Sequence, residues 1–232
     1  MVPGQRVTDG DFIESRDGRQ GAPRHDSVRV MSTARHMPLM TREEFLDWAE
    51  AQDQRYEFDG FQPVAMTGGT RNHSQISGNI YFAMRSRLQG TGCVPFGPDA
   101  GVATIGSAVR YPDALVTCTS GPGTDRVVPG AVVVFEVLSP TSGRTDHIEK
   151  LREYQAVPSI RRYVILEHTS VGLVVHSRLN GNDPWTATPL TDGDILRMPE
   201  IGIEIPISEF YEGTDLLIPP EPGIDDRAAT TP

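Results

Sequence analysis

The sequence predicts a single folded domain of the α/β class, mixed α+β in arrangement, with a central mixed β-sheet flanked by helices and with additional β-hairpins. Three observations lead to this prediction. Two segments place apolar residues at helical spacing, two short apolar runs are long enough for buried strands, and further apolar runs occur in pairs around turn residues. A chain of 232 residues with 38% hydrophobic composition is large enough to bury one sizeable core.

The first elements of the domain are predicted to be a helix, a hairpin and a longer helix. Thr41 and Glu44 have the spacing of a capping box, which begins a helix that reaches about Gln52. Residues 56–66 then contain two short strand-forming runs around a tight Asp-Gly turn, which is typical of a hairpin. Apolar residues at helical spacing predict the longer helix over residues 71–89.

Strands are predicted next, around Val102, Asp113 and Glu136, because apolar and β-branched residues dominate these segments. A turn-rich break follows the third of them, and Pro158 ends the helix that comes after this break. The remaining predicted elements are, in order, this helix at 146–155, paired strands at 162–166 and 172–176, and a terminal turn at 207–211.

The ends of the chain are predicted to lie outside this domain, which we place at residues 38–213. Residues 1–37 show no apolar period and residues 214–232 are rich in proline, so both are expected to be disordered. We find no signal peptide and no apolar run that could span a membrane. Cys93 and Cys118 are expected to be core thiols without a disulfide framework, which favours a cytoplasmic location.

Lys150 is the only lysine in the chain, against 20 arginines. A lysine amine is a compact charge that can sit beside a water or a phosphate oxygen, whereas a guanidinium is a planar fork. Position 150 is therefore a candidate for a role that needs an amine. The alternative is a basic residue on a solvated helix face.

Two carboxylates occur within the apolar strand-forming runs, Asp113 in the first and Glu136 in the second. A lone acid inside a buried strand is costly unless it is paired or binds a cation. Carboxylates without histidine form the hard-oxygen ligand set that suits Mg²⁺ or Mn²⁺. The sequence therefore predicts a divalent-metal site at these strands.

The helix that follows carries three further polar groups at intervals of four residues, Asp146, Lys150 and Tyr154. This spacing places an acid, an amine and a phenol on one helical face, where they could reach the same cleft. The alternative is an ordinary ion-pair face with Tyr154 packed beneath it.

As a set, these residues resemble the PD-(D/E)XK nuclease superfamily and, within it, the Uma family of restriction-endonuclease-like proteins. The resemblance covers about residues 38–213. In the wider superfamily a lysine commonly stands two residues after the second acid, where this chain has Leu138. The Uma pattern instead places it on the following helix, which Lys150 matches. The matching segments are Arg55-Tyr56-Glu57, Asp59-Gly60, Gly68-Gly69 with His73 and Ser74, Tyr111-Pro112-Asp113, Glu136 to Pro140, Lys150 with Tyr154, and Glu209 to Gly213.

The resemblance implies a restriction-endonuclease-like core and a role for each residue. Asp113 and Glu136 would be metal ligands, Glu57 a third acid near the metal, Lys150 the catalytic lysine, and Tyr154 a neighbour that orients the lysine or the phosphate. The expected activity is a divalent-metal-dependent endodeoxyribonuclease, in which the metal stabilises charge and lowers the pKa of the attacking water. For Glu57 an alternative is a surface acid on a hairpin.

Two other residues are weaker candidates for binding substrate. His73, near the start of the long helix, could hydrogen-bond a phosphate or a site carboxylate, although such a histidine more often caps its own helix. Arg110, just before the Tyr-Pro-Asp segment, could contact a substrate phosphate, but an exposed ion pair is an equal alternative.

The net charge of −10 opposes long-range attraction to DNA, so weak or partner-assisted DNA binding is expected. Two other hypotheses stay open. One is a catalytically weak or inactive nuclease fold that serves as a binding or regulatory dimer, and the other is a nuclease that acts on RNA or another phosphodiester. A homodimer is expected because twofold dimers are common and cutting a duplex requires two sites.

Overall fold

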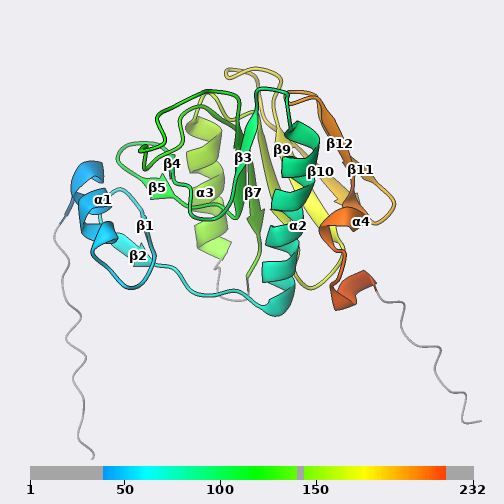
Figure 1. The fold of residues 1–232 in the computed structure, drawn as a ribbon, viewed down its shortest axis with the longest axis horizontal. Helices are drawn as coiled ribbons and strands as arrows, with labels where there is room; N and C mark the ends of the chain where they lie inside the picture. Colours follow the sequence, from blue (N-terminus) through cyan, green and yellow to red (C-terminus); the bar gives the residue numbers. More distant parts are fainter. Residues whose placement is uncertain (1–38, 140–143, 218–232) are drawn as a thin grey trace, which may run out of the picture. The chain divides into compact units, whose positions relative to one another are not determined.

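The computed structural model describes residues 39–139 and 144–217, and its central element is a mixed six-stranded sheet (Figure 1). The strand order is β10-β9-β8-β7-β6-β3. Only β7 and β8 pair in parallel within this sheet, and all other neighbours are antiparallel. The predicted mixed α/β class is therefore confirmed. The strands are β3 (Val94–Phe96), β6 (Ala114–Thr117), β7 (Ala131–Val137), β8 (Arg162–Leu166), β9 (Gly172–Ser177) and β10 (Thr186–Thr191).

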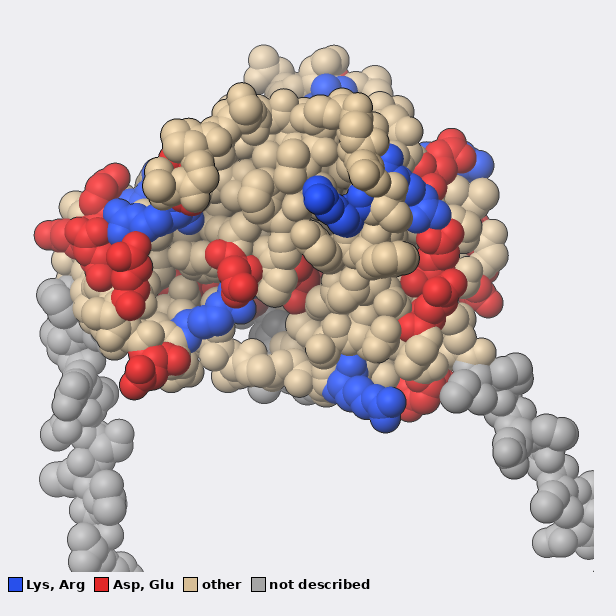
Figure 2. Space-filling view, viewed as in Figure 1, with Lys and Arg blue, Asp and Glu red and all other residues tan. Residues whose placement is uncertain are grey.

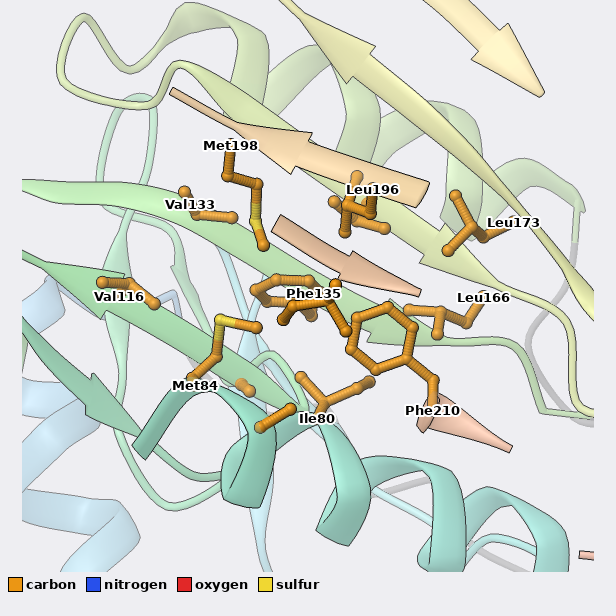
Figure 3. Packing of buried hydrophobic residues seen from close by; sticks show 14 of the residues in the cluster. Ile80, Met84, Val116, Val133, Phe135, Leu166, Leu173, Leu196, Met198 and Phe210 are labelled. Atoms are coloured by element: carbon orange, nitrogen blue, oxygen red, sulfur yellow. The ribbon is translucent and has the colours of Figure 1, made fainter. Parts of the chain in front are cut away.

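One face of this sheet carries the main hydrophobic core. Phe135 lies at its centre, fully buried, with its ring 6.4 Å from that of Phe210 (Figure 3). Ile80 and Met84 of the long helix pack against the same strands. The elements on this face are α2 (Arg71–Leu88), α4 (Ile207–Phe210) and the hairpin of β11 (Ile195–Met198) and β12 (Ile203–Pro206).

Helix α3 (Arg144–Ala156) covers the opposite face, so the sheet lies between α2 and α3 (Figure 1). Tyr154 of this helix packs with Leu115, Val134 and Tyr163 of the sheet. Alternate residues of a strand point to opposite faces, and those of β7 therefore divide between the two helices. Phe135 belongs to the α2 side and Val134 to the α3 side, which places Glu136 toward α3.

A second, smaller sheet contains the first strands of the described chain and packs against helix α1. Its order is β2 (Pro63–Ala65), β1 (Tyr56–Phe58), β5 (Val109–Arg110) and β4 (Val102–Ala103). Helix α1 (Arg42–Glu50) joins it through Phe45, whose ring stacks on Phe58 at 4.8 Å. The predicted capping box is confirmed, since Thr41 and Glu44 each bond the backbone of the other.

The fold continues four residues beyond its predicted end, to Leu217. Thr214 is buried and its hydroxyl donates to the carbonyl of Tyr211 at 2.6 Å. Asp215 begins a short 3-10 helix, η1 (Asp215–Leu217), and accepts a hydrogen bond from Asn72. The predicted N-terminal extension and the rest of the predicted tail lie outside the described residues. Within the described part of the chain, no helix has the length and apolar character to cross a membrane.

The expectation that the two cysteines are free thiols was wrong, because Cys93 and Cys118 form a disulfide. Val94 pairs with Thr117 in the antiparallel register of β3 and β6, so the next residue outward on each strand faces the other. Their Cα atoms are 4.0 Å apart. The argument for a cytoplasmic location from free thiols therefore loses its support.

The two edges of the large sheet share one feature. Its edge strands are β3 and β10, and each contains a proline, Pro95 and Pro189. Proline has no backbone N–H, which is why it is confined to edge strands, strand starts and bulges. The positions of Pro95 and Pro189 therefore agree with β3 and β10 as the edge strands.

We expect Phe135→Ala to lower the free energy of unfolding by about 3–5 kcal/mol, because it removes a fully buried aromatic ring from the centre of the core. Phe82→Ala is the matched control, since this ring is 73% exposed and its loss is expected to change stability by less than about 0.5 kcal/mol. Urea unfolding of both variants measures the difference. Equal effects would contradict the placement of β7 at the core.

Candidate active site

A cleft of about 320 Å³ lies where the hairpin of β1 and β2, the start of β6, the end of β7 and helix α3 meet. Four of the predicted catalytic residues line it, namely Glu57, Asp113, Glu136 and Lys150. His73 also lines the cleft, and Tyr154 reaches Glu136 from beneath. Residues far apart in the sequence therefore converge at one place.

Asp113 immediately precedes β6, beside the end of β7. Ala114 pairs with Phe135 in the antiparallel register, so Asp113 and Glu136 occupy neighbouring positions on adjacent strands. One oxygen of Asp113 accepts a hydrogen bond from the backbone N–H of Val137 at 2.8 Å, and the other accepts from the Ser77 hydroxyl at 3.0 Å. These bonds fix the orientation of the carboxylate.

His73 stands on the first turn of α2, with its Nε2 3.6 Å from Asp113 Oδ1. Its backbone N–H donates to the N-cap residue Thr70, so the backbone of His73 does take part in capping its helix. The imidazole, however, faces the cleft. Both readings of His73 from the sequence are thus compatible with its position.

Glu136 lies on the α3 side of β7 and contacts Lys150 and Tyr154 of that helix. Its Oε1 accepts a hydrogen bond from the Tyr154 hydroxyl at 3.1 Å and lies 3.4 Å from Lys150 Nζ. Burial raises the pKa of this carboxyl to about 8, and the negative charges of Glu57 and Asp113 add to the rise that Lys150 partly offsets. A further cation in the cleft would favour the ionised form.

Lys150 is surrounded by acids. Its Nζ is 3.0 Å from Glu57 Oε1, 3.4 Å from Glu136 Oε1 and 4.0 Å from Asp146 Oδ2. Burial alone would lower the pKa of this amine, but the neighbouring carboxylates outweigh burial and raise it. Lys150 therefore carries a positive charge in the cleft, and the predicted shared face of Asp146, Lys150 and Tyr154 is observed.

Glu57 is a buried residue, 6% exposed, although an exposed hairpin acid was one alternative from the sequence. Its Oε1 accepts from the backbone N–H of Tyr111 at 3.2 Å and also contacts Lys150. Its Oε2 accepts from Arg110 at 3.2 Å. Both oxygens of Glu57 are thus engaged by donors of the protein itself.

Arg110 is also buried, 2% exposed, and does not line the cleft, so it is not the exposed ion pair that was one alternative. Its Nε and one terminal nitrogen form a fork on Glu153 at 2.8 and 2.6 Å. Thr104 donates to the same carboxylate at 2.9 Å. The acids Glu153 and Glu57 raise the pKa of Arg110 although burial opposes this.

Sequence reasoning missed Glu153. In the sequence it resembles any acidic residue on an exposed helix, and its partners Thr104 and Arg110 are more than 40 residues away. The one available signal was its position, three residues after Lys150, which places it beside the lysine on the helix.

The donors of the cleft fit a hard divalent cation in part. Among residues 39–139 and 144–217, no group of three or more histidine, cysteine, aspartate or glutamate side chains is arranged to hold a metal. Asp113 and Glu136 nevertheless both line the cleft from neighbouring positions of adjacent strands, and the negative charges of Asp113 and Glu57 around Glu136 favour a cation. Two carboxylates suit Mg²⁺, which usually keeps several of its waters.

Residues 42–208 match the model of the Uma2 family, which is described as a putative restriction endonuclease. Because this match covers most of the chain, the protein belongs to the Uma2 family.

Two proteins of a cyanobacterium are similar in sequence to this chain. The uncharacterized protein slr1290 of Synechocystis sp. is 28% identical over 178 residues, which cover 76% of this chain and 93% of that protein. A second protein of that organism, sll1609, is 22% identical over 156 residues, which cover 66% of this chain and 88% of that protein.

A solved structure shares the fold. It is a putative nuclease of DUF820 from Anabaena variabilis, with a TM-score of 0.59 and 14% identity, covering 74% of this chain and 97% of that chain. The restriction-endonuclease-like core predicted from the sequence is thereby confirmed.

We expect Glu136→Gln to become progressively more stable relative to the wild type as the pH rises from about 5 to 8. In this window the folded wild type, with a pKa of about 8 at Glu136, keeps a proton that the unfolded chain, with an ordinary pKa of 4.5, releases. Raising the pH therefore lowers the free energy of unfolding of the wild type, by on the order of 3 kcal/mol in total. Glutamine does not titrate, so the variant does not show this loss. Urea unfolding of chelator-treated protein across this range measures it. If the difference in the free energy of unfolding between the two proteins did not change with pH, the raised pKa of Glu136 would be contradicted.

Proposed function

We propose that this protein is a divalent-metal-dependent endonuclease that hydrolyses phosphodiester bonds in DNA. The observation that carries the proposal is the pair Asp113 and Glu136 on adjacent strands, with the charged amine of Lys150 3.4 Å from Glu136 in the same cleft. Membership of the Uma2 family supports the same class of chemistry.

Asp113 and Glu136 would hold the metal, Mg²⁺ or Mn²⁺. When bound, such an ion neutralises charge on the phosphate and leaving oxygen and makes a water molecule more acidic. Ser77 and the N–H of Val137 hold the Asp113 carboxylate in place. Tyr154 holds Glu136 in the same way, and its hydroxyl stays a donor because burial and Glu136 raise its pKa.

Lys150 would act on the substrate directly. A protonated amine can donate a hydrogen bond to a phosphate oxygen and stabilise the negative charge that develops there during hydrolysis. His73 lies across the cleft beside Asp113, where it could donate to another phosphate oxygen. Both groups approach from helices, so the sheet supplies the acids and the helices supply the donors.

The charge of the protein sets an expectation for DNA affinity. Figure 2 shows acidic side chains gathered over α1 and beside α4, with basic residues among them. Together with a net charge of −10, this favours weak or partner-assisted binding. A homodimer would bring two clefts to the two strands of a duplex.

A second function is favoured by one observation. Lys150, Arg110 and Tyr154 already engage the carboxylates of Glu57 and Glu136, and three acids free to bind a metal are not found together in the described residues. A catalytically inactive nuclease fold, used as a binding or regulatory dimer, would keep such a network as a purely structural feature. Absence of metal binding in the wild type would favour it.

We expect the wild type to nick supercoiled plasmid with Mg²⁺ or Mn²⁺, and Asp113→Asn and Lys150→Ala each to lose at least about 10²-fold in rate. Calorimetry on the same samples is expected to show lost metal binding for Asp113→Asn and retained binding for Lys150→Ala. The matched control is Glu200→Gln, since Glu200 is another shielded acid in an ion pair, with Arg162, but it does not line the cleft.

The outcomes separate the hypotheses. Equal metal affinity in Asp113→Asn and the wild type would contradict the assigned site. Cleavage of a single-stranded RNA of matched sequence at a higher rate than DNA would assign RNA as the substrate. Metal binding without cleavage of either would exclude the nuclease proposal for these substrates.

A further inference from the structure

Four ionic side chains, one of them Lys150, form a chain of contacts that begins and ends on helix α3, so the helix backbone closes the chain into a ring. Glu57 contacts Lys150 through one oxygen and Arg110 through the other. Arg110 forks onto Glu153 with its remaining nitrogens, and Glu153 lies one helical turn after Lys150 on α3. We call these four residues, Glu57, Arg110, Glu153 and Lys150, the ionic ring.

The ionic ring is shielded from solvent and balanced in charge. Side-chain exposure is 8% for Glu57, 3% for Arg110, 10% for Glu153 and 12% for Lys150. The ionic ring contains two negative and two positive side chains, so their charges compensate one another where little water is present to do so. Outside the ring, the hydroxyl of Thr104 also donates a hydrogen bond to Glu153.

The ionic ring contains a directional contact that restrains the position of Lys150, whereas the other contacts of the lysine are not directional. A lysine amine sits on a flexible four-carbon stem and makes no directional fork. The remaining packing of α3 is largely apolar, through Leu151 and Tyr154. Arg110, by contrast, binds Glu153 through two parallel hydrogen bonds, which fix both distance and orientation.

We propose that Glu153 and Arg110 are positioning residues that act on Lys150 through Glu57 and through the helix. The inference rests on the proposed function, in which Lys150 is the catalytic amine. The ring holds the amine of Lys150 toward Glu136, and Glu57 serves as the anchor of the lysine rather than as a metal ligand. In this proposal Glu57, Arg110 and Glu153 do not touch the substrate.

The single lysine allows a test that does not require activity. Protein labelled with ¹³C and ¹⁵N only at lysine gives one set of lysine signals, all from Lys150. We expect Glu153→Gln to shift these signals, and Thr104→Val, which removes only a hydroxyl that supports Glu153, to shift them in the same direction and by less. Glu200→Gln, in the separate ion pair with Arg162, is the control and is expected to leave them unchanged.

The second arm measures cleavage and metal binding. Glu153→Gln is expected to lower kcat at least about tenfold while KM and Mg²⁺ affinity change less than about twofold, because misplacing a catalytic group acts mainly on the chemical step. In a Lys150→Ala background the same substitution is expected to change the residual rate by less than about twofold, since its effect passes through the lysine.

Each result decides between positioning and simple stabilisation. Unchanged lysine signals in both Glu153→Gln and Thr104→Val would overturn the proposal, as would a further loss of rate from Glu153→Gln in the Lys150→Ala background. Loss of metal affinity in Glu57→Gln would return Glu57 to the metal site. A wild type without cleavage would count against the proposed function alone, because the lysine signals still test the ring.

Discussion

The constraint on which this structure depends is the compensation of negative charge in a shielded cleft. Glu57, Asp113 and Glu136 line the cleft, and Glu153 is buried outside it. Lys150 contacts Glu57 and Glu136, and Arg110 contacts Glu57 and Glu153. Removing one partner of a buried ion pair typically costs about 3–5 kcal/mol, because it leaves a charge without compensation. Both oxygens of Glu57 and of Glu153 accept from donors of the protein, whereas Glu136 is only partly compensated by Lys150. Burial, together with the charges of Glu57 and Asp113, therefore raises the pKa of Glu136 to about 8.

The fold makes this arrangement possible through the crossover between β7 and β8. A parallel pair needs a long connection, and here the connection is α3, which carries both Lys150 and Glu153. Because β7 alternates its side chains, Phe135 builds the core on one face while Glu136 meets the helix on the other. The same strand therefore supports stability and the candidate chemistry.

Much of this could be predicted from the sequence because the informative residues are locally unusual. Asp113 and Glu136 are acids in apolar runs, and Lys150 is a single lysine among arginines. The helix bounds followed from the capping box at Thr41 and from the proline after α3.

The rest depends on pairings between distant segments. The disulfide of Cys93 and Cys118 follows from the register of β3 on β6, which no local pattern specifies. From the sequence, Arg110 was a candidate for a phosphate contact or an exposed ion pair, and Glu153 resembled an ordinary surface charge. Their pairing depends on the fold, which brings the two segments together and shields both side chains. Whether an acid in such a cleft binds a cation or pairs with a lysine depends on distances that composition does not contain.

The prolines at the two ends of the large sheet bear on how copies of this protein could associate. Pro95 in β3 and Pro189 in β10 each remove a backbone donor from an edge strand, where an added strand would need a continuous ladder of hydrogen bonds. Both edges are thereby poor templates for extending the sheet into a second molecule. Association of two copies by continuing the large sheet from one molecule into the next is therefore disfavoured.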